Sequence, residues 1–151
     1  MDALTLLVDD HRRIDQLFDA VSEGDTTAVP QVCEALLLHS RMEEEVLYPT
    51  IHGNLEAVQW DVSAALEDHL IMRRLISELS EESGESPSYL TKAGVLMRLV
   101  RDHVREEDTV YRVETVEGEQ PCVRIWALAE EAHAAYPVIN RRVLPHLNVS
   151  E

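Results

Sequence analysis

Two pairs of residues with the same spacing could bind a metal ion: His39 with Glu43, and His103 with Glu107. Residues four apart lie on one face of an α-helix, so each pair would present an imidazole beside a carboxylate. Apolar residues recur around His39 at spacings of three and four: Val32, Ala35, Met42 and Val46. This pattern directs His39 and Glu43 toward a core. Because burying an unpaired charge is costly, these side chains need a partner, and a metal ion would satisfy both.

Two more histidines occupy positions that should face the same core. His11 interrupts a series of apolar residues with helical spacing: Leu4, Leu7, Ile14, Phe18 and Val21. His69 interrupts a similar series: Val62, Ala65, Met72, Ile76 and Leu79. Such seams are typical of amphipathic helices that pack against one another. His11 and His69 therefore stand where an apolar side chain would be expected.

The two halves of the chain repeat each other. Asp10-His11 recurs as Asp68-His69, 58 residues later (69 − 11), and His39-x-x-x-Glu43 recurs as His103-x-x-x-Glu107, 64 residues later (103 − 39). Each half reads as one helical hairpin, and two hairpins joined by short loops make an up-down-up-down four-helix bundle. Counting residues from each turn places the four histidines in about one cross-section of the bundle, with the glutamates one turn along.

The fold class is therefore all-α, and the chain divides at its polar, glycine- and proline-containing breaks. The four helices should cover about residues 2–21, 28–48, 54–82 and 89–113. We assign residues 1–113 to the bundle and residues 114–151 to a C-terminal helical cap of the same domain, with a short helix over about 122–135. A length of 151 residues agrees with one domain.

The histidine layer favours a metal over an ordinary core. A single histidine on an apolar face is usually a hydrogen-bonded core residue, but four at one level would bury many polar groups, each costing roughly 1–3 kcal/mol if unpaired. Mixed imidazole and carboxylate sites suit iron, zinc or manganese. Six ligands exceed what one tetrahedral zinc ion uses, whereas two ions bridged by two glutamates use all six. The neighbouring Glu44 and Glu45 are expected to be solvated.

The composition limits the partners. The formal net charge of −16, from 29 acidic and 13 basic residues, disfavours nucleic acid and anionic membrane surfaces. No apolar run approaches the ~20 residues of a membrane span, and the N-terminus does not resemble a signal peptide. Cys33 and Cys122 form no CxxC pair and provide no disulfide framework, so we expect a reducing, cytoplasmic location.

The ordered set His11, His39-x-x-x-Glu43, His69 and His103-x-x-x-Glu107 resembles the hemerythrin-like HHE cation-binding domain. The resemblance covers about residues 2–113. It implies a non-haem di-iron centre with oxo or hydroxo and carboxylate bridges. In that centre the four histidines would be terminal ligands, and Glu43 and Glu107 would bridge the two iron ions.

The sequence departs from the oxygen-carrying hemerythrins at two positions. Those proteins have a fifth histidine one turn after the third, and here that position is Arg73. They commonly use an aspartate five residues after the last histidine, and Asp108 stands at that spacing; the internal repeat favours Glu107, with Asp108 in reserve. Asp15 occupies the position that corresponds to Arg73, where it could pair with Arg73 or approach an iron ion, although charged residues at such positions are more often solvated.

The chain is more similar to the branch with four histidines and two glutamates, which includes proteins linked to iron–sulfur cluster repair and nitrosative stress. This resemblance implies a protein that binds O2, NO or peroxide in sensing, detoxification or iron handling. Two alternatives remain open: a di-iron peroxidase or catalase-like enzyme, and a metal-free structural or interaction bundle. With two imidazoles per iron ion, we expect exchangeable positions on both ions and consumption of oxidants rather than storage of O2. The C-terminal tail could also form a homodimer.

Overall fold

The computed structural model describes residues 3–51, 60–111 and 118–135, with side chains described as far as residue 131. All regular structure within these ranges is helical, which confirms the all-α class. The elements in chain order are α1 (Ala3–Ser22), α2 (Ala28–Met42), the π-helix η1 (Glu43–Leu47), α3 (Tyr48–Ile51), α4 (Val62–Glu81), α5 (Pro87–Tyr111) and α6 (Gln120–Ala135).

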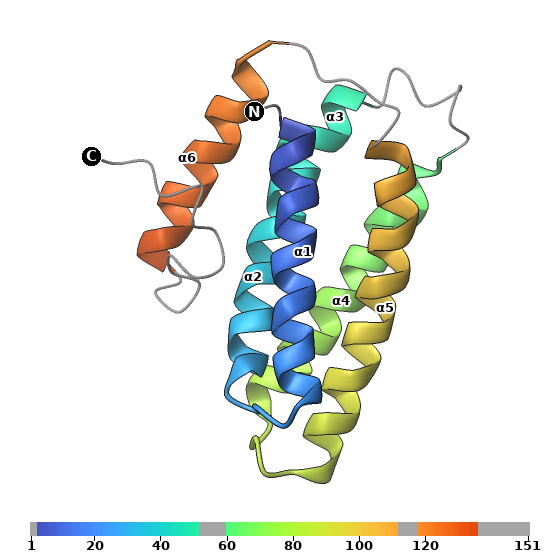
Figure 1. Ribbon diagram of the computed structural model, residues 1–151, viewed down its shortest axis with the longest axis vertical. Coiled ribbons are helices and arrows are strands. Elements are labelled where there is room, and N and C mark those ends of the chain that lie inside the picture. Colours follow the sequence, from blue (N-terminus) through green and yellow to red (C-terminus); the bar gives the residue numbers. More distant parts are fainter. Residues whose placement is uncertain (1–2, 52–59, 112–117, 136–151) are drawn as a thin grey trace.

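The first five α-helices and η1 form a four-helix bundle, because α2, η1 and α3 follow one another without a break (Figure 1). Helix α1 packs against α2 and α5, and α4 packs against α5 and α2. Each helix therefore lies beside its chain neighbours, and α1 and α5 close the ring. This is the predicted up-down-up-down arrangement.

Local sequence signals set the helix ends that the bundle needs. Helix α1 ends in a Schellman motif: Gly24 adopts a φ of +104°, its N–H donates to the Val21 carbonyl, and the Asp25 N–H donates to the Ala20 carbonyl. Helix α4 begins after Asp61, whose carboxylate accepts hydrogen bonds from the next turn. Helix α5 begins at Pro87, where the missing N–H costs nothing.

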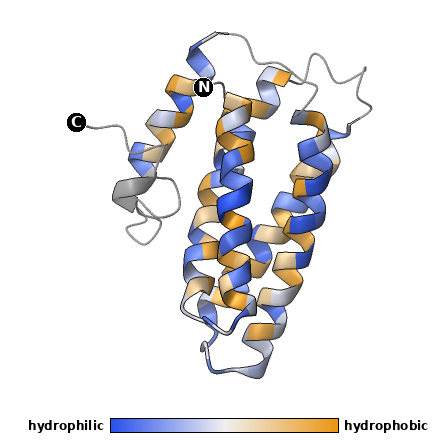
Figure 2. Cartoon of the chain, in the orientation of Figure 1, coloured by the Kyte–Doolittle hydropathy of each residue, from blue (hydrophilic) through white to orange (hydrophobic). Residues whose placement is uncertain are grey.

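The core consists of the apolar stripes that the spacing predicts. Figure 2 shows hydrophobic residues on the helix faces that meet inside the bundle and hydrophilic residues on the outside. The α1 stripe is buried along its length: Leu4, Leu7, Ile14, Phe18 and Val21. Burying such a side chain contributes about 1.5–3 kcal/mol, so these stripes supply the stability that holds a polar layer in their midst.

The predicted third helix is wrong at its start. Residues 54–59 lie outside the described ranges, and the helix begins at Val62. Trp60 has no regular structure, and Asp61 has an extended backbone with φ −98° and ψ 100°. Apolar spacing continues through Leu55 and Val58 in the sequence, but it does not register an N-cap, and Asp61 is the residue that starts the helix.

The second helix differs from a plain α-helix through η1. In this segment the Tyr48 N–H donates to the Glu43 carbonyl, five residues back. A π-turn inserts one residue into the helical repeat and often occurs at functional sites. Val46 stays buried, as predicted, but the turn also brings Tyr48 inward, where it is 3% exposed. Period counting could not detect this insertion.

Helix α6 confirms the expected C-terminal helical appendage. It packs against α1, α2 and η1, and buries Ile125, Leu128 and Ala129. The predicted boundary at residues 113 and 114 lies within residues 112–117, outside the described ranges, as does the tail over 136–151. In the described part of the chain, no helix is both long and apolar enough to cross a membrane.

Candidate metal centre

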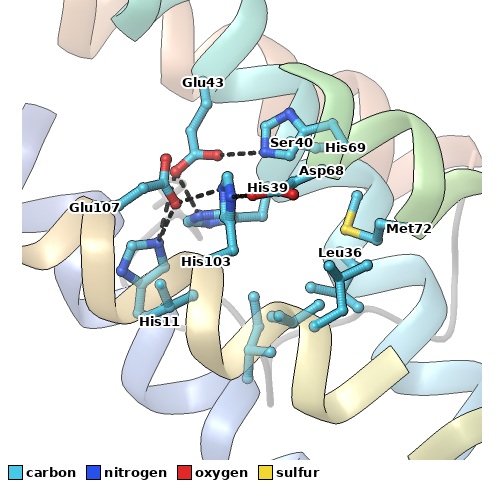
Figure 3. A pocket seen from close by; sticks show the side chains of 14 residues that line it. His11, Leu36, His39, Ser40, Glu43, Asp68, His69, Met72, His103 and Glu107 are labelled. Atoms are coloured by element: carbon cyan, nitrogen blue, oxygen red, sulfur yellow. Dashed lines mark hydrogen bonds and ion pairs between the residues drawn. The ribbon is translucent and has the colours of Figure 1, made fainter. Parts of the chain in front are cut away.

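The structure brings all six predicted site residues into one buried layer (Figure 3). The glutamates are the least exposed, at 0% for Glu43 and 1% for Glu107, and the four histidines are 9% exposed or less. The rings meet in pairs, with centroids 4.6 Å apart for His11 and His39 and 4.9 Å apart for His69 and His103. The predicted common level of the histidines is confirmed.

The ligand atoms gather in two groups that share both carboxylates. One group consists of His11, His39, Glu43 and Glu107, and the other of His69, His103 and the same two glutamates. In each group the donor atoms lie within 4.8 Å of one another. Each group joins residues from three helical segments, which are α1, the α2–η1 segment and α5 for the first, and η1, α4 and α5 for the second.

The helical i, i+4 spacing sets the shortest contacts inside the layer. His39 Nε2 lies 2.9 Å from Glu43 Oε1, and His103 Nε2 lies 2.9 Å from Glu107 Oε1. The lone histidines reach the carboxylates from the other helices. His69 Nε2 lies 3.2 Å from Glu43 Oε2, and His11 Nε2 lies 3.5 Å from Glu43 Oε1.

Three of these buried atoms form no well-aligned hydrogen bond among the described residues, although two of them lie 2.9 Å from each other: His11 Nε2, His103 Nε2 and Glu107 Oε1. All three point into the shared layer. Buried polar atoms in folded proteins are nearly always satisfied, so lone pairs that converge without hydrogen bonds fit a cation between them. Imidazole and carboxylate donors suit a first-row transition metal.

Each histidine is held from outside by a carboxylate at its other ring nitrogen. His39 Nδ1 donates to Asp10 Oδ2 at 2.6 Å, and His103 Nδ1 donates to Asp68 Oδ2 at 2.9 Å. These contacts join the two helices of one hairpin. Because a carboxylate can only accept, each contact fixes a proton on Nδ1 and turns Nε2 toward the layer.

The other two outer carboxylates join different hairpins. His11 Nδ1 donates to Asp108 Oδ1 at 2.8 Å, and His69 Nδ1 donates to Glu44 Oε1 at 3.0 Å. The expectation that Glu44 is solvated is therefore wrong, because its side chain is 25% exposed and also accepts from Arg73 at 2.9 Å. Asp108 lies outside both ligand groups and contacts His11 from behind.

Two of these outer carboxylates belong to a repeated Asp-His pair, whose role was not predicted from the sequence. Asp10 and Asp68 directly precede the lone histidines in both halves of the repeat. Each one turns away from its own neighbour and meets the histidine on the next helix. The repeated Asp-His pair therefore marks a contact between helices, which spacing within one helix could not reveal.

Asp15 neither pairs with Arg73 nor approaches the ligand groups, and the solvated alternative holds. Arg73 donates to Glu44, and the Asp15 carboxylate, which is 55% exposed, pairs with Arg101 at 2.8 Å. Asp15 is oriented to the surface and is not part of either ligand group. Asp15 lies on α1 and Arg73 on α4, and both of these helices pack chiefly against α2 and α5, so the two residues belong to opposite helices of the ring.

Two tyrosines cover one side of the layer, and sequence reasoning missed both. The Tyr111 hydroxyl donates to Glu43 Oε1 at 2.8 Å and to Glu107 Oε2 at 2.7 Å. The Tyr48 hydroxyl donates to Glu107 Oε2 at 2.5 Å and lies 3.2 Å from Glu43 Oε2. Trp60 meets both rings edge-on. Tyr111 follows Glu107 by four residues, so the i, i+4 rule could have found it; Tyr48 depends on the π-turn.

The opposite side of the layer opens into a small apolar cavity of about 20 Å³. Its apolar walls lie one turn beyond the histidines and include Ile14, Leu36, Met72 and Val100. A water molecule needs roughly 10–15 Å³, so one small molecule fits here. The layer therefore has a hydrogen-bonding face of phenols and an apolar face with room for a ligand.

The titration behaviour follows from this packing. Burial alone would lower the pKa of His39, but the Glu43 charge and the hydrogen bond to Asp10 outweigh burial and hold this pKa well above 6.5. For His103 the same balance, with Glu107 as main partner, raises the pKa to about 9. Burial would raise the pKa of Glu43, but His39 and its neighbours hold it well below 4.5. A metal ion would therefore displace protons from the imidazoles.

Comparison with known families agrees with this geometry. The family model of the hemerythrin HHE cation binding domain matches residues 2–112. The chain belongs to this hemerythrin-like family. The match covers the whole bundle and every residue of the two ligand groups. The resemblance predicted from the sequence is confirmed, and with it a hemerythrin-like bundle that binds a metal cation.

One relative of this chain has a name that does not refer to hemerythrin or to cation binding. A DNA nickase of Nostoc sp. is 26% identical to this hemerythrin-like chain over an alignment of 105 positions that covers 66% of this chain and 29% of the relative. The chain therefore spans less than a third of that protein's length. No solved structure matches the chain.

Proposed function

We propose that this chain is a non-haem di-iron protein that binds O2, NO or peroxide, in sensing, detoxification or iron handling. The observation that carries the proposal is the pair of buried donor groups that share Glu43 and Glu107. One iron ion would take His11 and His39, and the other would take His69 and His103. Membership of a cation-binding family supports a metal at this layer.

In this proposal the protein holds, orients and shields the ions. The outer carboxylates fix the four imidazoles, and the phenols of Tyr48 and Tyr111 hold the two shared carboxylates. Two iron ions would supply exchangeable ligand positions and the electrons for reaction with O2, NO or peroxide. The apolar cavity would admit a small ligand and keep most water away.

The absence of a fifth histidine sets the kind of chemistry we expect. Arg73 keeps its proton and offers no lone pair, so it cannot ligate, and it bonds to Glu44 instead. Each ion would then have two imidazoles, with exchangeable positions on both. We infer that such a centre consumes oxidants and does not carry O2 reversibly.

The partners follow from the same site. We propose small diatomic or peroxide ligands and no nucleic acid, because a net charge of −16 repels a polyanion. The nickase name belongs to the larger relative, and the region in common is a minor part of it. We further propose a cytoplasmic protein of one domain, divided into residues 1–113 and a cap over 114–151, with a homodimer through the tail as one possible assembly.

A peroxidase or catalase-like enzyme is the second candidate function. It is favoured by the two phenol O–H groups, which contact the carboxylates at 2.5–2.8 Å and could pass protons to a reacting ligand. Burial and the charges of Glu43 and Glu107 raise the pKa of Tyr48, and the same causes act on Tyr111, so both hydroxyls keep their protons. A metal-free structural bundle is the third candidate, since imidazolium and carboxylate groups could satisfy one another.

Elemental analysis of protein from iron-fed cells separates these candidates. About two iron ions per chain after gel filtration is the expected result, and a Glu43→Gln variant is the matched control, because it keeps the side-chain shape and removes the charge. Absence of any transition metal from the wild type would leave the metal-free bundle. Hydrogen peroxide turnover by the loaded protein, against a Tyr111→Phe variant, then distinguishes an enzyme from a binder.

A further inference from the structure

A groove of about 650 Å³ runs over the outer surface between α1 and α5. Four of the residues that line it also line the internal cavity below the histidine layer: His11, Ile14, Val100 and Val104. The outer groove and the inner cavity are therefore the two sides of one layer of side chains. At this seam a single layer of side chains separates the solvent from the two ligand groups.

The wall between groove and cavity is one side chain thick and mostly apolar. Three of its four residues are apolar, with no hydrogen bond between their side chains to break. Val104 is only half-buried. Rotamer changes of partly exposed side chains occur within nanoseconds, so movement of Val104 is the least costly way to let a small molecule pass while the helices stay folded.

The internal repeat shows how the other seam differs. The offsets of 58 and 64 residues map Asp15 onto Arg73 and Asp108 onto Glu44. At the seam between α2 and α4, Arg73 and Glu44 form an ion pair at 2.9 Å across the two helical segments. At the seam between α1 and α5 both corresponding residues are acidic, so they cannot pair with each other. Asp15 pairs instead with Arg101 of α5, and Asp108 pairs with His11 of α1. Both contacts cross this seam, but no ion pair joins the two positions that correspond to Arg73 and Glu44.

The rim of the groove is less acidic than the protein as a whole. Arg12, Arg101 and Arg105 line it together with two aspartates, in a chain that has 29 acidic and 13 basic residues. The Arg12 and Arg105 side chains are 72% and 76% exposed. Each of these arginines pairs with an aspartate, so the rim is close to neutral and repels small anions less than the surrounding acidic surface does.

We propose that the groove between α1 and α5 is the entrance by which small ligands, monoanions included, reach the centre, because Asp15 and Asp108 form no bridge over its wall like that of Arg73 and Glu44. The inference rests on the proposed function, since it concerns the access of a ligand to a metal in the layer. Arg73 and Glu44 close the equivalent position on the other seam.

Azide binding to the iron-loaded protein tests this entrance. The probe variant is Asp15→Arg, which gives α1 the residue that α4 has at position 73, within reach of Asp108. Narrowing the entrance raises the free-energy barrier that azide crosses in both directions and does not change the free energy of the bound state. We therefore expect the association and dissociation rate constants to fall together, about tenfold, with Kd within twofold of wild type. Stopped-flow absorbance at the azide-to-iron band measures both rates.

Two further variants make the test decisive. Asp19→Arg is the matched control, because it makes the same charge change one turn along α1 and loses the same partner, Arg101, without lining the groove. It should bind azide at the wild-type rate. Val104→Phe thickens the wall and should slow both rate constants, as Asp15→Arg does. Iron content and circular dichroism establish that each variant is folded and loaded.

The outcomes separate the two levels of the proposal. Iron-loaded Asp15→Arg and Val104→Phe proteins with unchanged azide rates would overturn the entrance and leave the di-iron assignment intact. Equal slowing in Asp19→Arg would also overturn it, since charge alone would then explain the effect. A wild-type protein that takes up no iron would overturn the proposed function itself.

Discussion

The seam between α2 and α4 and the seam between α1 and α5 present the same residue types to the inner layer and different ones to the surface. Inside, each half presents two histidines and one glutamate to a common layer, with an aspartate or glutamate behind every ring. Outside, Arg73 and Glu44 pair with each other across the seam between α2 and α4. At the seam between α1 and α5 the corresponding Asp15 and Asp108 do not pair with each other, and each contacts a different residue of the facing helix, Arg101 and His11. The repeat has kept its ligand geometry and changed its surface.

The difference shows which positions the chemistry constrains. Ligand atoms must converge within a few ångströms, so residue types in the layer can change little. The side chains behind the histidine rings only have to fix a ring or cover a seam between helices. A carboxylate on either of the two helices that form the seam can do so. Access can therefore be adjusted at the outer positions without altering the two ligand groups.

The largest effect should come from removing a shared carboxylate. Glu43→Ala should remove metal from both positions, because both ligand groups use this side chain. Glu44→Ala should keep both metals and weaken binding about 10- to 100-fold at the position of His69, since Glu44 only orients that ring. Metal content after dialysis measures the difference. Equal losses in the two variants would contradict the assignment of inner and outer roles.

Metal removal should lower the free energy of unfolding of both helical hairpins together. A metal present at 1,000 times its Kd stabilises the folded state by about 4 kcal/mol, which corresponds to a fall in Tm on the order of 10 °C on chelation. Calorimetry before and after chelation measures it, with protein shown to have held metal. Because the layer joins all four helices of the bundle, one transition is expected; an unchanged Tm would show that the layer is a self-satisfied polar network.

A new imidazole at position 73 should alter the reaction with O2. Arg73→His places a possible fifth ligand one turn after His69 and frees Glu44 from its ion pair. We expect the reduced variant to release part of its O2 under vacuum, while the wild type is oxidised irreversibly. The matched variant is Asp15→His, at the repeat-equivalent position. Reversible O2 uptake by the wild type would refute the oxidant-consuming role.

The smallest effect should come from opening the closed seam. The Arg73 and Glu44 side chains are 35% and 25% exposed, so their ion pair contributes little to stability. Arg73→Gln should therefore leave the Tm within a few degrees of wild type and raise the azide association rate about two- to threefold, by adding a second entrance. A lower association rate would show that Arg73 attracts the anion and does not block it.

The sequence was sufficient for the bundle and for the inner layer. Periodic spacing found the stripes that contain His11, His39, His69 and His103, because burial of a helix face depends on a fixed repeat. The i, i+4 rule found Glu43 and Glu107. Their common level followed from the equal rise of antiparallel helices.

The parts that the sequence missed depend on contacts between helices or on a local break in the repeat. Asp10 meets His39 and Glu44 meets His69, and spacing within one helix contains no information about such pairs. Tyr48 reaches the layer only because η1 adds a residue to the turn. The start of α4 depends on the Asp61 cap, a local hydrogen-bond preference that apolar spacing does not record.

Anomalous diffraction at the iron edge, from crystals of the iron-loaded wild-type protein, tests the central claim most directly. The account predicts two iron peaks in the histidine layer, one beside His11 and His39 and one beside His69 and His103, with Glu43 and Glu107 in contact with both. A single peak, or iron bound by Asp108 in place of Glu107, would contradict the two groups that share their carboxylates.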